Sequence, residues 1–172
     1  MNDTFLPGNG FDTYEEQDRV LMGLSGSVRS GVAVRILQQQ GFAVAAAVVR
    51  LADTPEEHAA AEAAKALAKK LDVECLALNA EALAGQDVEA ARFAALLTAA
   101  DKLGIQYVAS SHYARMETDT QGVSHLFPPE SGAPDESSRL SALSPEVLTR
   151  LILPLGDFAP EDVAEMAADF KL

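Results

Sequence analysis

The sequence contains little of what several protein classes require. Its 172 residues include a single cysteine, Cys75, and no tryptophan. One cysteine excludes an internal disulfide and a metal site built from several cysteines, and it suits a reducing cytoplasm. Apolar runs fall short of the roughly 20 residues that a membrane span needs, and the first residues lack the basic start and apolar core of a signal peptide. We therefore predict a cytoplasmic protein without a membrane segment and without a metal site.

Basic residues are also scarce. The chain has 26 acidic against 13 basic residues, a net charge of −13. An acidic surface repels a phosphate backbone, so the charge balance disfavours a general nucleic-acid binder. The charge is unevenly spread, since residues 19–52 contain four arginines and no acid. This stretch is the first candidate region for binding an anion.

What the sequence does contain is a regular alternation of apolar strands and amphipathic helices. The length fits one domain at 19–172, preceded by a flexible acidic leader at 1–18. The pattern predicts strands at 19–25, 42–51, 73–78 and 105–110, and helices at 31–40, 55–71 and 87–103. Such an order predicts an α/β fold, a doubly wound, Rossmann-like parallel sheet with helices on both faces.

The pattern changes after Tyr113. Residues 117–139 are rich in serine, glycine, proline and acids, which indicates a loop or flap with a short strand at 123–127. A helix restarts at 144, residues 151–156 form an apolar connection, and residues 160–170 form a last amphipathic helix. This part is therefore expected to decorate the sheet rather than extend it.

The most informative local feature is the loop Ser25-Gly26-Ser27-Val28-Arg29-Ser30, between the first strand and its helix. Ligands of open α/β sheets bind beyond the carboxyl ends of the strands. A Gly/Ser loop there directs N–H groups and hydroxyls to one point, and the helix dipole favours an anion. An ordinary strand-to-helix turn is the alternative, and the two common nucleotide fingerprints, G-x-x-x-x-G-K-[ST] and G-x-G-x-x-G, are absent.

Few other residues suggest chemistry. The segment Ser110-Ser111-His112 ends the fourth predicted strand, at the same edge of the sheet as the Gly/Ser loop, but no acid near it in the sequence completes a catalytic triad. We expect His58 to be solvated and His125 to have no role. Cys75 fits a small core residue of a strand.

Several ordered stretches resemble the N-terminal domain of the tRNA 2-thiouridylases, a branch of the PP-loop ATP pyrophosphatases. They are 19–30, 108–115, 153–157 with the helix that follows, and more weakly 135–140. The family adenylates a tRNA uridine and then replaces its oxygen with sulfur from a cysteine persulfide. The resemblance implies ATP or AMP as cofactor. It also implies a nucleotide or anion site. The residues at the matching positions, with Arg29 added from the loop, are Ser25, Gly26, Ser27, Arg29, Ser30, Ser111, His112 and Arg115.

The chain departs from the family at the residues that do the chemistry. Ser27 replaces the second glycine of the family loop Ser-Gly-Gly-Val-Asp-Ser, and Arg29 replaces its aspartate. An arginine cannot manage magnesium as an acid does, which argues against a magnesium site. Pro134 replaces the lysine of the family's lysine-aspartate-glutamine-serine segment, and residues 85–93 lack the family's cysteine motif. We therefore predict no catalytic residues of the sulfur-transfer reaction, as in a pseudoenzyme.

Three interpretations follow. The first is a degenerate PP-loop domain that binds an adenine nucleotide or a phosphate-like anion. The second is an adenylating subunit of a split tRNA-thiolation system. The third is a non-catalytic interaction module with an empty site, in which Arg29 fills the phosphate position and pairs with a local acid. We expect a homodimer or a protein partner, and we do not expect this chain alone to bind tRNA.

Overall fold

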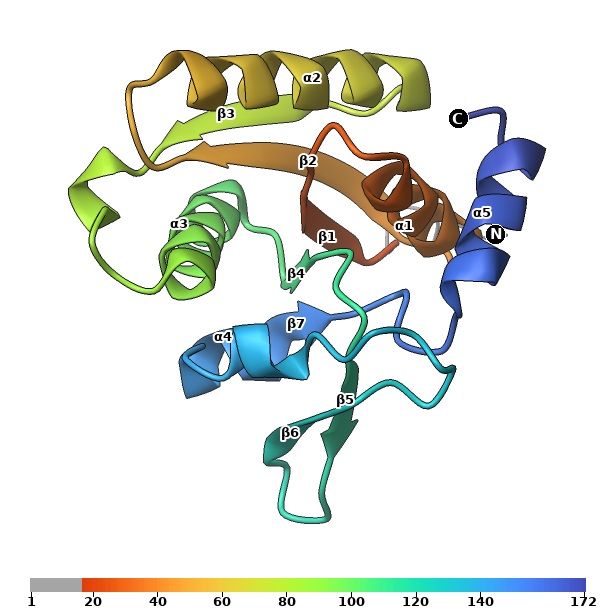
Figure 1. Cartoon of the computed structure of the whole chain (residues 1–172). Helices are drawn as coiled ribbons and strands as arrows, with labels where there is room; N and C mark the ends of the chain where they lie inside the picture. Colours follow the sequence, from red (N-terminus) through yellow and green to blue (C-terminus); the bar gives the residue numbers. More distant parts are fainter. Residues whose placement is uncertain (1–16) are drawn as a thin grey trace, which may run out of the picture.

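The core of the protein is a five-stranded parallel sheet with the strand order β3-β2-β1-β4-β7 (Figure 1). The computed structural model describes residues 17–172. The strands are β1 (Arg19–Gly23), β2 (Ala43–Arg50), β3 (Cys75–Asn79), β4 (Tyr107–Ala109) and β7 (Leu151–Ile152). The predicted doubly wound α/β fold is confirmed. The expected apolar connection at 151–156 is wrong at its start, because Leu151 and Ile152 pair with β4 as a fifth strand.

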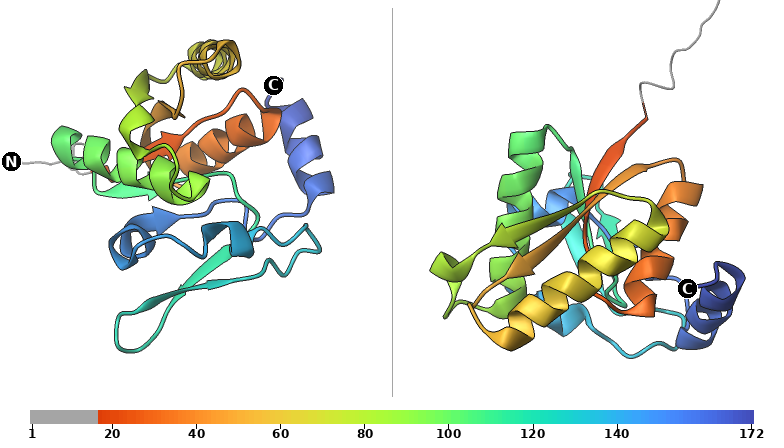
Figure 2. Two further views of the ribbon diagram at one scale, coloured as in Figure 1. Left: turned by 60° about the vertical axis from the view of Figure 1, so that its left-hand side comes forward. Right: turned by 90° about the horizontal axis from the view of Figure 1, so that it is seen from above.

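Helices cover both faces of the sheet. Helices α1 (Val28–Gln39), α2 (Pro55–Leu71) and α5 (Pro160–Asp169) pack over one buried cluster, whereas α3 (Val88–Leu103) and α4 (Pro145–Arg150) pack over a second. Side chains of β1 alternate between them, since Val20 and Met22 join the first cluster and Leu21 the second. The view from above in Figure 2 shows the strands lying between α1 and α3.

Local capping explains where the helices begin and end. Thr54 accepts a hydrogen bond from the Glu57 N–H before Pro55, and Asp87 accepts one from the Ala90 N–H. These caps place the helix starts at Pro55, as predicted, and at Val88, one residue after the predicted 87, because Asp87 is the capping residue. Helix α1 begins at Val28, earlier than the predicted 31, because the Ser27 side chain accepts a hydrogen bond from the Ser30 N–H. Part of the predicted loop is therefore the first helical turn.

The region after β4 holds an antiparallel hairpin that projects away from the sheet (Figure 1). It consists of β5 (Arg115–Thr118) and β6 (Ser124–Phe127). The predicted short strand at 123–127 corresponds to β6, whereas β5 is not foreseen. The described part of the chain also contains the short 3-10 helices η2 (Glu81–Leu83) and η3 (Ser137–Leu140).

The described residues begin just before the predicted domain at 19–172. Residues 1–16 of the predicted leader lie outside the described residues, and the backbone carbonyl of Asp18 already accepts a hydrogen bond from Ala43 at the start of the sheet. Within residues 17–172, none of the helices has the length and apolarity to cross a membrane.

Arg150 fastens α4 and β7 to the neighbouring loop. Its guanidinium donates to the carbonyl oxygens of Ile105 (2.9 Å) and Gln106 (2.8 Å) and to the carboxylate of Asp101 (2.7 Å). We predict that Arg150→Lys lowers the free energy of unfolding by about 1–3 kcal/mol, because a lysine cannot serve both carbonyls. Urea denaturation measures this change. Asp101→Asn, which removes only an exposed ion-pair partner, should change it by less than about 1 kcal/mol; equal losses in both variants would contradict the assignment.

Candidate functional site

The carboxyl ends of the central strands open onto a cavity of about 280 Å³. Its walls come from the loop after β1, the segment after β4, and the first turns of α2 and α3. The position is the topological switch point, since β2 and β4 flank β1 on opposite sides. Six of the predicted site residues line this cavity: Ser25, Gly26, Ser27, Arg29, Ser111 and His112.

The other two predicted residues lie elsewhere. Ser30 is fully buried beneath the loop, and its hydroxyl lies 2.9 Å from the Ser25 carbonyl and 2.8 Å from the Ser27 carbonyl. Ser30 therefore supports the loop from below. Arg115 lies on the hairpin, where it pairs with Glu117 and stacks over the Phe127 ring. It helps to line a different hollow, next to β7.

The hydroxyls of the Gly/Ser loop are hydrogen-bonded to one another. The Oγ atoms of Ser25 and Ser27 are 2.7 Å apart, and the Ser27 Oγ also accepts from the Ser30 N–H at 3.3 Å. The serine that replaces the family's second glycine thus caps α1. Close packing against α2 requires glycine at position 26, because a Cβ added to Gly26 would come within 2.6 Å of the Ala63 Cβ.

Arg29 is paired with an acid that is far away in the sequence. Its guanidinium donates to both carboxylate oxygens of Glu136, at 3.2 and 3.4 Å, and lies 4.6 Å from the centre of the Tyr113 ring. The Tyr113 N–H donates to the same carboxylate at 2.8 Å. The pair therefore joins the first turn of α1 to the segment that precedes η3.

His112 also has an acidic partner. Its Nδ1 is 2.7 Å from the Ser110 Oγ, and its Nε2 lies 3.6 Å from a Glu89 carboxylate oxygen, beyond ordinary hydrogen-bond length. The facing His112 ring holds the pKa of the Glu89 carboxyl below its usual range; burial opposes this, and Arg92 and Arg139 reinforce it. The acid that is missing near His112 in the sequence is thus supplied by α3.

The positive charge of the cavity comes from three elements. Arg29, Arg92 and Arg139 line it together with Glu57 and Glu89. Of the four arginines in residues 19–52, only Arg29 lines the cavity. Arg19 lies at the opposite end of β1, Arg35 bonds to the end of α2, and Arg50 bonds to Glu81 of η2. The start of α3 lies at the carboxyl edge of the sheet. In the sequence, the position of Glu89 and Arg92 near the start of this predicted helix could have indicated that they belong to the site.

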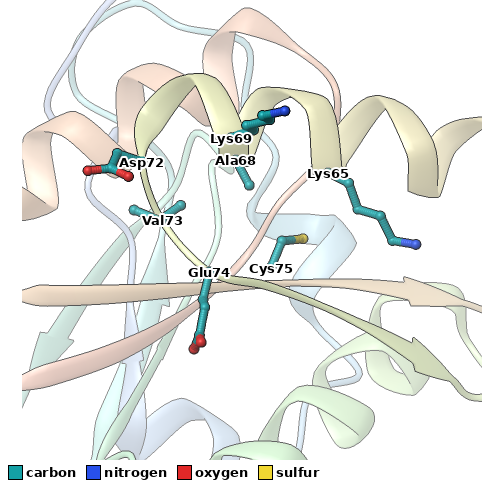
Figure 3. A pocket seen from close by; sticks show the side chains of 7 residues that line it. All are labelled: Lys65, Ala68, Lys69, Asp72, Val73, Glu74 and Cys75. Atoms are coloured by element: carbon teal, nitrogen blue, oxygen red, sulfur yellow. The ribbon is translucent and has the colours of Figure 1, made fainter.

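His58, His125 and Cys75 lie away from this cavity. His58 and His125 are exposed and each pairs with an aspartate. A separate hollow at the end of α2 includes Cys75, whose side chain points toward α2 whereas that of Glu74 points away (Figure 3). Burial raises the pKa of the Cys75 thiol. Within residues 17–172, histidine, cysteine and carboxylate side chains form no cluster of three or more suited to a metal ion.

The sequence matches the model of a known family and several known proteins. The family is described as the tRNA methyl transferase HUP domain, and the match covers residues 18–89 and 88–172. The tRNA-specific 2-thiouridylase MnmA of Streptococcus thermophilus is 30% identical over 182 residues, which cover 90% of this chain and 49% of the relative. The corresponding enzyme of Levilactobacillus brevis is 31% identical over 183 residues, with 91% and 49% coverage. The chain thus spans about half the length of the curated relatives it matches.

Solved structures show the same fold at much lower sequence identity. The U34-tRNA thiolase NcsA from Methanococcus maripaludis, solved with its [4Fe-4S] cluster, has a TM-score of 0.61 and 15% identity, covering 90% of this chain and 57% of the thiolase. A predicted subunit of tRNA methyltransferase from Methanocaldococcus jannaschii has a TM-score of 0.53 and 16% identity, with 88% and 76% coverage. Both likenesses concern the fold alone.

The Glu89–His112 contact predicts a specific pH dependence. Because the pKa of Glu89 is lowered in the folded protein, its carboxylate stabilises the fold above the ordinary glutamate value of 4.5, and this is lost as the pH falls through the lowered pKa. Glu89→Gln should therefore be less stable than the parent at pH 7, and the gap should narrow toward pH 3.5. Urea titrations at several pH values measure the gap. In a His112→Gln background it should be much smaller at pH 7; an unchanged gap there would refute the contact.

Proposed function

The chain belongs to the tRNA methyl transferase HUP domain family, and on that premise we propose that it binds an adenine nucleotide or a phosphate-like anion in the cavity at the switch point, without transferring sulfur. Its PP-loop fold resembles the N-terminal domain of the tRNA 2-thiouridylases. The observation that carries the proposal is that three arginines meet at this cavity in a protein with a net charge of −13.

The geometry of the cavity supports anion binding. The N-terminus of α1 is part of its wall, and helix N-termini favour negative charge. Arg29, Arg92 and Arg139 reach the wall from α1, α3 and η3, so cationic groups approach a ligand from several directions. Guanidinium groups suit phosphate oxygens because they donate two parallel hydrogen bonds.

The position of the single cysteine supports the absence of sulfur transfer. Residues 85–93, where the resemblance expects a cysteine motif, supply Glu89, Arg92 and Phe93 to the cavity wall. Cys75 lies on β3, the edge strand, and lines the separate hollow at the end of α2. A thiol with a raised pKa is also a poor nucleophile near neutral pH.

A non-catalytic interaction module is the second candidate, and the Arg29–Glu136 pair favours it. A carboxylate of the chain itself already holds the cation that a phosphate would need. The loop serines likewise bond to each other. In that case the arginines stabilise the fold, and added anions leave the protein unchanged.

Ligand-induced stabilisation tests the proposal, with two neighbouring alanines of α2 as a matched pair. Ala60 lines the cavity and Ala59 does not, while both are exposed on the same helix. We predict that AMP or another phosphate compound at about 100 times its Kd adds about 2.7 kcal/mol to the free energy of unfolding. Ala60→Leu should reduce this gain by narrowing the cavity, and Ala59→Leu should not. Thermal unfolding with AMP, ATP, pyrophosphate and sulfate, each with and without magnesium, provides the measurement.

The outcomes separate the candidates. A shift with a nucleotide that Ala60→Leu abolishes supports a nucleotide site, and a shift with all anions alike supports a simple phosphate pocket. If none of the ligands changes the melting temperature, the proposal fails and the interaction module takes its place.

A further inference from the structure

The Glu136 carboxylate is surrounded by hydrogen-bond donors that could otherwise bind a small anion. It accepts hydrogen bonds from the Arg29 guanidinium and from the Tyr113 N–H, and Arg139 lies 3.5 Å away. The Glu136 side chain is only 13% exposed, so these contacts are partly shielded from water. Two guanidinium groups and one N–H around one carboxylate are what a bound phosphate would otherwise receive.

This carboxylate balances the charge at the cavity. The lining carries three arginines, Arg29, Arg92 and Arg139, against two carboxylates, Glu57 and Glu89. Glu136 pairs with two of these arginines and supplies a third negative charge. Three carboxylates therefore stand against the three arginines of the site.

A balanced site treats ligands differently according to their charge. Each phosphate that enters must give up hydration, and an uncompensated buried charge is costly. A single phosphate has to share Arg29 and Arg139 with Glu136, whereas the additional phosphates of a triphosphate meet no further excess of cations. The cavity volume of about 280 Å³ is also just below the range, about 300–1,000 Å³, that is usual for ligand pockets.

We propose that Glu136 is a specificity-determining residue that sets the ligand charge, so that the cavity takes a nucleoside monophosphate in preference to the triphosphate. The inference rests on the proposed function, since it names the ligand class of the same site. Removing the charge of Glu136 leaves Arg29 and Arg139 available and shifts the preference toward more phosphates. The shift grows with ligand charge because the Coulomb energy does.

Calorimetric titration with adenosine, AMP, ADP and ATP tests this, at fixed ionic strength and without magnesium. The parent protein should bind AMP more tightly than ATP. Glu136→Gln keeps the side-chain shape, and its amide oxygen still accepts from the Tyr113 N–H. It should raise the ratio of ATP to AMP affinity by about tenfold and leave the affinity for adenosine nearly unchanged.

Glu117→Gln is the matched control. It removes the same charge and also releases an arginine, but that arginine is Arg115 on the hairpin. The ratio of ATP to AMP affinity should stay as in the parent. Arg29→Gln gives a second test with the opposite sign, because it leaves Glu136 without its closest cation and should lower the ratio.

The results distinguish failure of this inference from failure of the proposed function. An equal gain for AMP and ATP in Glu136→Gln, or a parent that already prefers ATP, overturns the role of Glu136 alone. If neither the parent nor any variant binds any of the four ligands, and pyrophosphate and sulfate also leave the melting temperature unchanged, the proposed function is overturned and the inference falls with it. Melting temperatures identify a variant that is not folded, and the remaining variant then decides.

Discussion

The pairing of β1 with both β2 and β4 constrains the rest of the molecule. The chain leaves β1 for β2 on one side and returns as β4 on the other. Parallel connections are right-handed, so α1 and α3 must cover opposite faces, and the segments after β1 and β4 diverge. The space between them is the cavity. The loop serines and His112 come together there because of the strand order, although they are far apart in the sequence.

The elements that the sequence predicts well are those with local causes. Thr54 with Pro55, and Asp87 with Gly104, mark helix ends by hydrogen bonds to nearby backbone and by favourable backbone conformations. By contrast, β7 has only two residues and exists because it pairs with β4, a contact that no local pattern encodes. Strand β5 is likewise hidden, since Arg115–Thr118 shows no run of apolar side chains. Long-range pairing explains both omissions.

The same division applies to the candidate site. The Gly/Ser loop is recognisable because its residue types and its place after a strand are local properties. The carboxylates that pair with the basic groups of the site, Glu89 and Glu136, come from other elements, and no local sequence pattern marks them. Arg29 stands where the resemblance has aspartate, and Glu136 stands, by the same register, where it has glutamine. Both departures from the family pattern therefore belong to one contact, because Arg29 and Glu136 form an ion pair with each other.

Charge acts on two length scales in this protein. The net charge of −13 creates a field that repels a long polyanion such as tRNA, whose phosphates extend well beyond one Debye length. A small phosphate compound inside the cavity would interact mainly with the groups that touch it. Three arginines and two carboxylates line the cavity, and Glu136 pairs with two of these arginines. The proposed ligand is accordingly a small anion, and we do not expect this chain alone to bind nucleic acid. The adenylating alternative accordingly requires that the positive surface for the RNA and the thiols come from outside these 172 residues.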